Sequence, residues 1–238
     1  MRFGSRKIDF GSHKVVCQFM KGIFNLKPSL PRYAHIWDPD LVLSYLHKLH
    51  PTRKLPLKLL TFKTVTLLAL LSVQRVQTLH VMRVDDVSFS SDHVQIVVNS
   101  SLKTSRPNWH LQPIVLRKYS NKHLCIFRCL RHYIARTHSI RGSETKLFIS
   151  FAKPHRCVTT STIGRWIKIV LSRSGVDINM YKAHSTRAAS ASKANLHVST
   201  SKILKAGGWS SSNSFQKHYN LSSNLSTDVQ DAILGGDQ

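Results

Sequence analysis

Two short stretches near the end of the sequence decide the fold: HSTR at residues 184–187 and GGWSSSNSFQKHY at residues 207–219. His184 and Arg187 are three residues apart, a spacing that places both side chains on one face of a helix. A tyrosine, Tyr219, follows on a segment that we expect to form a further helix. A histidine and an arginine at this spacing occur by chance in many helices, so their interpretation depends on the rest of the chain.

The chain is strongly basic. Its 238 residues carry 35 lysines and arginines against 11 aspartates and glutamates, a formal net charge of +24. Hydrophobic residues make up 42% of the sequence, enough for a core, which excludes a disordered basic tail. This charge favours a polyanion as the partner, with DNA or RNA first and a membrane surface as the weaker alternative. Because arginine can clamp a phosphate and tyrosine can act as a nucleophile, the two stretches indicate phosphodiester chemistry.

No segment is typical of membrane insertion or secretion. The longest apolar run, Val65 to Val73, is interrupted by Thr66 and Ser72 and falls short of the roughly 18 residues that a spanning helix needs. The N-terminus lacks the apolar core of a signal peptide. We therefore expect an intracellular protein, nuclear if its host is eukaryotic, with no membrane and no small-molecule substrate as partner.

The cysteines allow a metal site but favour a structural role. Cys125 and Cys129 are four residues apart on a predicted helix, with His123 and His132 nearby. No C-x-x-C pair occurs, and a free cysteine usually behaves as a small buried hydrophobic residue. The sequence therefore predicts no metal and no other cofactor.

The order of the periodic patterns predicts helices, then a small antiparallel sheet, then helices again. Asp38 and Pro39 are typical of a helix start, Gly175 of a helix end, and Pro113 of an edge strand. The fold class is mostly α with a small antiparallel β-sheet (α+β). Helices are expected at residues 15–24, 38–49, 57–73, 74–82, 123–137, 160–174, 200–206 and 212–219, and strands near 87–89, 94–98 and 110–116.

Six residues then form an ordered set: Arg75, Lys103, His184, Arg187, Trp209 and Tyr219. With this set the chain resembles the catalytic domain of tyrosine recombinases of the phage-integrase type over about residues 36 to 235. The stretches LLSVQRVQTL at 70–79 and GWSSSNSFQKHY at 208–219 look closest to recombinases of DIRS-type retrotransposons, which are mobile elements. The resemblance implies that double-stranded DNA is cut and rejoined through a 3′-phosphotyrosyl intermediate, without metal or ATP.

The resemblance also implies a role for each member of the set. Arg75 and Arg187 would bracket the scissile phosphate, and Tyr219 would attack it. Lys103, in the turn between two strands, would protonate the leaving 5′-oxygen. His184 would relay the tyrosine proton, and Trp209, which cannot exchange a proton, would position the nucleophile. Further DNA contacts are expected from Arg106, Lys182 and Lys205.

Two departures from the family pattern bear on these expectations. Thr78 stands where the family often has an acidic residue that orients the first arginine. The family also carries an N-terminal helical domain that closes around DNA, and here residues 1–35 are interpreted as a basic linker or a remnant of that domain. Residues 36–238 are interpreted as the catalytic domain. A homo-oligomer on DNA is expected, with Leu221 to Leu234 as a segment that docks on a neighbour.

Three other functions remain open from the sequence. A catalytically silent DNA-binding remnant of a mobile-element recombinase would have the same charge and fold. A basic RNA-binding protein would share the charge, although no aromatic stacking motif of the RRM type is present. A type IB topoisomerase would share the tyrosine chemistry without exchanging partner strands.

Overall fold

The chain divides into two units, residues 1–32 and residues 33–238. The computed structural model describes residues 11–28, 33, 35–102, 105, 110–209 and 215. In the first unit, α1 (Lys14–Leu26) is the described element, and its side chains are exposed. This helix agrees with the one expected at residues 15–24. Apart from Phe215, the helix predicted at residues 212–219 and the segment Leu221 to Leu234 lie outside the described residues.

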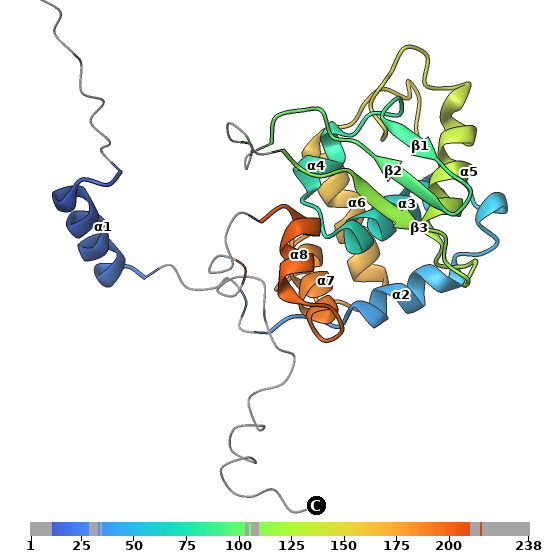
Figure 1. Ribbon diagram of the computed structural model, residues 1–238. Helices are drawn as coiled ribbons and strands as arrows, with labels where there is room; N and C mark the ends of the chain where they lie inside the picture. Colours follow the sequence, from blue (N-terminus) through green and yellow to red (C-terminus); the bar gives the residue numbers. More distant parts are fainter. Residues whose placement is uncertain are drawn as a thin grey trace, which may run out of the picture. The chain divides into compact units, whose positions relative to one another are not determined.

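The second unit is organised around one buried helix, α3 (Leu57–Ser72). It follows α2 (Pro39–Lys48) and a short 3-10 turn, η1 (Thr52–Lys54), and precedes α4 (Val76–Val81). Asp38 begins α2 by accepting a hydrogen bond from the backbone N–H of Asp40, as the sequence predicts. Most residues of α3 are buried, because α2, α5, α6 and α7 pack against it (Figure 1).

The sheet has three antiparallel strands in the order β1-β2-β3. They are β1 (Val87–Phe89), β2 (His93–Ile96) and β3 (Ile114–Arg117), with Val87 opposite Ile96 and Ile96 opposite Ile114. Val94 and Ile96 alternate inward to the core, which is the pattern of a half-buried strand. β3 begins directly after Pro113 and lies at an edge, as expected, because proline has no N–H to give to a ladder.

The described part of the second unit contains four more helices: α5 (Ile126–His138), α6 (Thr160–Arg173), α7 (Ser185–Asn195) and α8 (Thr200–Gly207). Helix α5 begins three residues later than the pattern predicts. Thr159 caps α6 by accepting from the N–H of Thr162, and Gly175 ends that helix with a φ of +88°. The predicted class, mostly α with a small antiparallel sheet, is confirmed. None of the described helices is long and apolar enough to cross a membrane.

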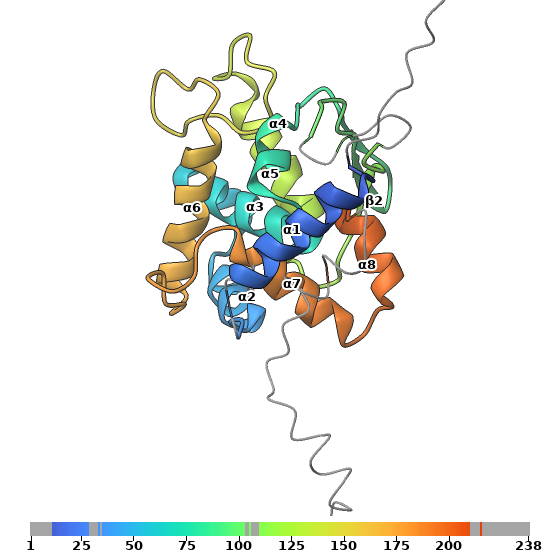
Figure 2. The same ribbon diagram turned by 90° about the vertical axis from the view of Figure 1, so that its left-hand side faces the viewer.

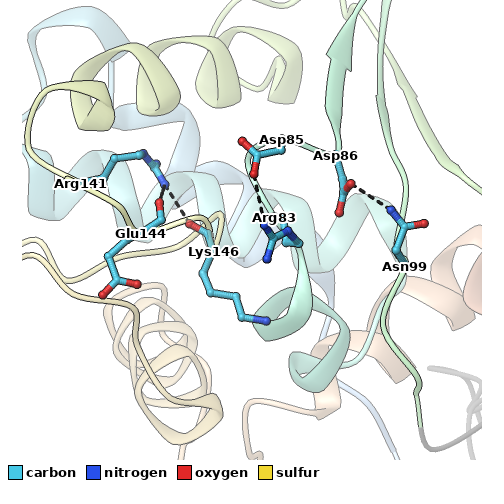
Figure 3. Close-up of polar contacts among 7 residues, drawn as sticks. All are labelled: Arg83, Asp85, Asp86, Asn99, Arg141, Glu144 and Lys146. Atoms are coloured by element: carbon cyan, nitrogen blue, oxygen red, sulfur yellow. Dashed lines mark hydrogen bonds and ion pairs between the residues drawn. The ribbon is translucent and has the colours of Figure 1, made fainter.

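A polar brace joins the loop after α4 to the loop after α5 (Figure 3). The buried guanidinium of Arg141 donates to the carbonyls of Glu144 and Lys146 at 3.3 and 2.9 Å. Lys146 forms an isolated antiparallel bridge with Arg83, which pairs with Asp85 at 3.3 Å. The brace fixes the path of the chain as it leaves α4 toward β1.

A small second cluster of apolar residues lies beneath the predicted site. It consists of Val73, Ala191, Ile203, Trp209 and Phe215. Its members come from the end of α3, from α7, from α8 and from the residues that follow α8. Because four segments meet in this cluster, its packing determines where the side chains at their ends point. Figure 2 shows α4, α7 and α8 on the side of the second unit that carries these ends.

Candidate active site

Four of the six predicted site residues lie in the described part of the chain. Arg75 immediately precedes α4, and His184 immediately precedes α7. Arg187 lies in the first turn of α7, and Trp209 follows α8. The two other members, Lys103 and Tyr219, lie outside the described residues, as does Arg106.

Arg187 is almost completely buried, with 2% of its surface exposed. Its Nη1 donates to the carbonyl oxygen of Val73 at 2.9 Å, and its guanidinium carbon lies 3.5 Å from the centre of the Trp209 ring. The hydrogen bond and the cation–π contact fix the plane of the guanidinium. Small residues along α7, among them Ala188 and Ala191, let neighbouring segments approach this closely. Burial of a charged side chain costs free energy, so a role in function is a reason for an arginine to be kept at this position.

The segment that carries Arg75 is held by the same helices. Val73 has a φ of +55°, a left-handed conformation that is unusual for a β-branched residue. This turn directs the Val73 carbonyl to Arg187 and leads the chain into α4. Next to it, the buried Gln74 donates through Nε2 to the carbonyl of Ala206 at 2.7 Å. Arg187 thus binds the carbonyl of Val73, which lies two residues before Arg75 in the chain. This contact brings the two predicted phosphate ligands into one region.

Arg75 itself is half-buried and is the N-cap residue of α4. Thr78, in the place of the family's acidic residue, is buried in the same helix. Within the described ranges, no ion pair involves Arg75. The contacts of Val73 and Gln74, its two predecessors, hold the backbone that leads into this arginine.

His184 is exposed at the start of α7 and contacts an aromatic residue far away in the sequence. The hydroxyl of Tyr33 lies 3.2 Å from His184 Nε2 and also accepts from the backbone N–H of Lys182 at 3.3 Å. Nearby, Trp37 donates through Nε1 to the hydroxyl of Ser185 at 2.8 Å. Two aromatic residues that precede α2 therefore hold the start of α7, and both were missed by the sequence analysis.

Substitution of Tyr33 by phenylalanine tests whether this contact positions His184. The change removes one hydrogen bond, worth about 0.5–1.5 kcal/mol, so we expect DNA cleavage about 2- to 10-fold slower with little change in thermal unfolding. The matched control is Tyr181→Phe. The Tyr181 ring contacts the Tyr33 ring at a tilt of 46° with ring centres 5.3 Å apart, but its hydroxyl donates to the carbonyl of His35 instead of contacting His184. Equal cleavage rates for the two variants would argue against a role for the Tyr33 hydroxyl.

Trp209 lies between Arg187 and the rest of the small cluster, with 7% of its surface exposed. Its ring meets Phe215 edge to face with centres 5.1 Å apart, and its backbone N–H donates to the carbonyl of Leu204 at 2.9 Å. The ring also lies directly over Gly207, where an added Cβ would stand 1.9 Å from Trp209 Cζ3. The glycine is therefore required by the close approach of the indole.

Gly207→Ala should displace Trp209 and with it the guanidinium of Arg187. Overpacking of this kind costs about 1–3 kcal/mol, so we expect a lower unfolding temperature and DNA cleavage at least about tenfold slower. The matched control is Gly164→Ala in the middle of α6, where the added Cβ would meet its nearest neighbour, Ala183 Cβ, at an ordinary 3.8 Å. The explanation fails if both alanine variants unfold and cleave alike.

The two described residues expected to contact DNA flank this region. Lys182 is exposed two residues before His184, and its Nζ lies 3.4 Å from the carbonyl of Asn179. Lys205 is exposed on α8 and lines a cleft of about 290 Å³ together with Gln112 and Lys202. Both cations have a surface position from which they can reach a backbone phosphate.

Two other tyrosines could compete with Tyr219 for the role of nucleophile, and their surroundings argue against both. Tyr133 is fully buried, its oxygen accepts from the N–H of Ile149, and burial raises its pKa to about 12. The pKa of Tyr181 is also raised, first by burial and then by the nearby Asp177 and Tyr33. A raised pKa keeps a phenol protonated, which makes it a weaker nucleophile.

The cysteine and histidine positions do not form a metal site in the described part of the chain. Cys125 and Cys129 are fully buried, and burial raises the pKa of Cys129 to about 11, so its thiol stays protonated at neutral pH. His123 stacks between the rings of His50 and His47, with ring centres at 3.8 and 4.1 Å. Stacked imidazoles present faces to one another rather than converging nitrogens.

The second unit has the catalytic-domain fold of tyrosine recombinases. Its helices pack around a three-stranded antiparallel sheet and bring Arg75 close to the helix of the H-x-x-R motif. Residues 43–224, well over half of the chain, match the profile of the Phage integrase family. The chain belongs to this family.

Solved structures show the same fold at low sequence identity. A XerH site-specific recombinase bound to its difH substrate is 11% identical, with a TM-score of 0.61, and the match covers 87% of this chain and 55% of that chain. XerA recombinase is 14% identical, with a TM-score of 0.57, and is matched over 93% of this chain and 73% of its own.

A lambda integrase dimer bound to a COC′ core site is 13% identical, with a TM-score of 0.51, and the match covers 81% of this chain and 50% of that chain. The chain thus spans about half the length of the XerH and lambda integrase chains that it matches. No curated protein matches it significantly in sequence.

Proposed function

We propose that this chain cuts and rejoins DNA strands through a phosphotyrosyl intermediate on Tyr219. The observation that carries the proposal is the burial of Arg187 against Trp209 and the carbonyl of Val73. Val73 lies only two residues before Arg75 in the chain. A charge held so firmly in a family of phosphoryl-transfer enzymes is best explained as a preorganised phosphate ligand. Preorganisation of this kind supplies much of the rate enhancement when charge builds up in a transition state.

In the proposed mechanism, Arg75 and Arg187 hold the non-bridging oxygens of the scissile phosphate. The phenolic oxygen of Tyr219 attacks phosphorus, and the bond between phosphorus and the 5′-oxygen breaks. The electron pair goes to the 5′-oxygen, which takes a proton from Lys103, while His184 accepts the proton of the tyrosine. The new phosphotyrosyl ester keeps the energy of the broken bond, so the reverse attack by a 5′-hydroxyl rejoins the strand without ATP.

The proposal extends to the partners and the division of the chain. Residues 36–238 act as the catalytic domain, with residues 1–35 as a linker or the remnant of a DNA-binding domain. Double-stranded DNA is the substrate, and copies of the chain assemble on it. The XerH and lambda integrase structures contain DNA, and the latter is a dimer, which supports this part of the proposal.

The likeness of residues 70–79 and 208–219 to DIRS-type recombinases carries the proposal one step further. The chain then serves a retrotransposon or a related mobile element and works in the nucleus of its host. Expression of a tagged protein in eukaryotic cells tests this step, since a protein excluded from the nucleus would contradict it.

The direct test of the proposed function is covalent capture of DNA. The protein is incubated with supercoiled plasmid in EDTA without ATP and then quenched with detergent. We expect a fraction of the DNA to migrate abnormally in a gel because protein is attached to it, and protease should restore its normal migration. Absence of such DNA, with salt-sensitive DNA binding retained, would favour the silent DNA-binding remnant. Preference for RNA in a salt-matched competition would favour an RNA-binding protein, and relaxed plasmid without recombinant products would favour a topoisomerase.

A further inference from the structure

A basic cleft of about 560 Å³ lies on the outer face of α5, outside the candidate active site. The pattern of the helix explains the cleft. Leu130 and Tyr133 on one side are buried, while Arg128 and Arg131, three residues apart, are exposed on the other. The cleft is lined by six basic residues: Arg53, Lys118, Arg128, Arg131, His132 and Arg136.

The positive charge of this cleft is not balanced by acidic side chains. No carboxylate lines it, and in the described part of the chain no ion pair involves its arginines or its lysine. The pKa of His132 is lowered by burial and then by Arg128, Arg53 and Arg131, which shows how closely the cations gather. Repulsion between like charges on one face destabilises a helix, and a bound anion would reduce this repulsion. The stability of the fold gives no reason to gather these cations, whereas anion binding does.

Two of the cations are already held by the fold, and three remain available at the rim. Lys118 donates through Nζ to the carbonyl of Ser91 at 2.6 Å and lies 5.0 Å from the Phe127 ring centre. Arg136 donates to the carbonyl of Leu55 at 2.9 Å. The exposed arginines Arg53, Arg128 and Arg131 are therefore the groups that can bind an anion.

The cleft and the candidate active site lie on different sides of the second unit. Helix α3 packs against α5 on one side and against α7, which carries Arg187, on another. Figure 1 shows α5 and α7 separated by α3, and Figure 2, turned by 90°, places α4, α7 and α8 in front of α5. Arg128 and Arg131 lie on the exposed face of α5, opposite its buried residues, and Arg53 lies on the neighbouring turn η1.

We propose that this cleft binds the phosphodiester backbone of a second DNA duplex, distinct from the duplex at Arg187. The neutralisation of backbone phosphates by exposed arginines needs no base contacts, so the binding is independent of sequence and sensitive to salt. Duplex DNA carries one negative charge per about 1.7 Å of its axis, which suits a row of cations along a helix. The cleft thereby holds a partner duplex near the one that is cut, and this binding does not depend on Tyr219.

A two-duplex capture experiment tests the proposal. An unlabelled duplex is fixed to a surface and saturated with protein, and a labelled second duplex is then added. In the variant Arg128→Gln/Arg131→Gln we expect unchanged binding of the first duplex, about tenfold less capture of the second, and a salt slope of second-duplex capture that is smaller by about 2. The charge-matched control is Lys58→Gln/Arg173→Gln, two exposed cations beside the Phe62 ring. It should capture the second duplex as the wild type does.

Several outcomes would overturn the proposal. The variant could capture the second duplex as well as the wild type, or the control could lose as much, which would mean that only total charge matters. Equal loss of the first and second duplexes would place the cleft on the path of one DNA. Stronger capture of labelled duplex RNA would change the ligand. Covalent DNA adducts report on the proposed function separately, so failure of one proposal is distinguishable from failure of the other.

Discussion

Arg187→Lys should lower the rate of DNA cleavage about 10²- to 10³-fold while the protein stays folded. The guanidinium of Arg187 donates to the carbonyl of Val73, and its carbon lies 3.5 Å from the centre of the Trp209 ring. A lysine keeps the charge but is a single point donor without a plane, so it can neither stack nor clamp a phosphate bidentately. Removal of one preorganised donor to a developing anion costs about 2.7–4 kcal/mol in enzymes that have been tested this way.

Single-turnover cleavage of a labelled duplex measures this effect, with thermal unfolding alongside. Arg173→Lys is the control, because Arg173 is an exposed arginine that also lies near an aromatic ring, that of Phe62, at 5.9 Å. We expect the control to cleave at the wild-type rate. A rate for Arg187→Lys within about threefold of the wild type would remove Arg187 from the phosphate site.

Tyr219→Phe should eliminate the covalent adduct and leave DNA binding intact. The substitution removes the only atom that the proposed mechanism uses as nucleophile, and it changes neither charge nor ring volume. The same plasmid assay measures the adduct, and a salt titration of DNA binding measures affinity. The control is Tyr181→Phe, which loses a phenol with a raised pKa and should still form the adduct. Adducts that persist in Tyr219→Phe would assign the chemistry to another residue.

Local patterns in the sequence predicted much of the fold. The largely apolar segment at residues 57–73 predicted a long helix, and α3 is that helix, with most of its residues buried. Alternation predicted β2, and Pro113 predicted the edge position of β3. The ends of elements were less predictable. Helix α5 begins at Ile126 rather than at residue 123, because the preceding residues form turns. In one of them the backbone N–H of His123 donates to the side chain of Asn121, a contact that hydrophobic periodicity does not predict.

The candidate site was predictable in its residue types but not in its supporting contacts. The order of arginine, H-x-x-R and tryptophan is visible in the chain. The contact between Tyr33 and His184 joins residues 151 positions apart, and no local pattern encodes such a pairing. The left-handed turn at Val73 was equally hidden, since a β-branched residue rarely adopts it and glycine is the usual signal.

The most direct test of the central claim identifies the residue that carries the DNA. The covalent adduct is digested with nuclease and then with trypsin, and the peptide that retains a nucleotide remnant is identified by mass spectrometry. Trypsin cuts after Lys217, so Tyr219 is the only tyrosine in the peptide of residues 218–238, HYNLSSNLSTDVQDAILGGDQ. We predict the remnant on Tyr219 of this peptide. A remnant on residues 174–182, SGVDINMYK, which contain Tyr181, or on any other peptide would contradict the account.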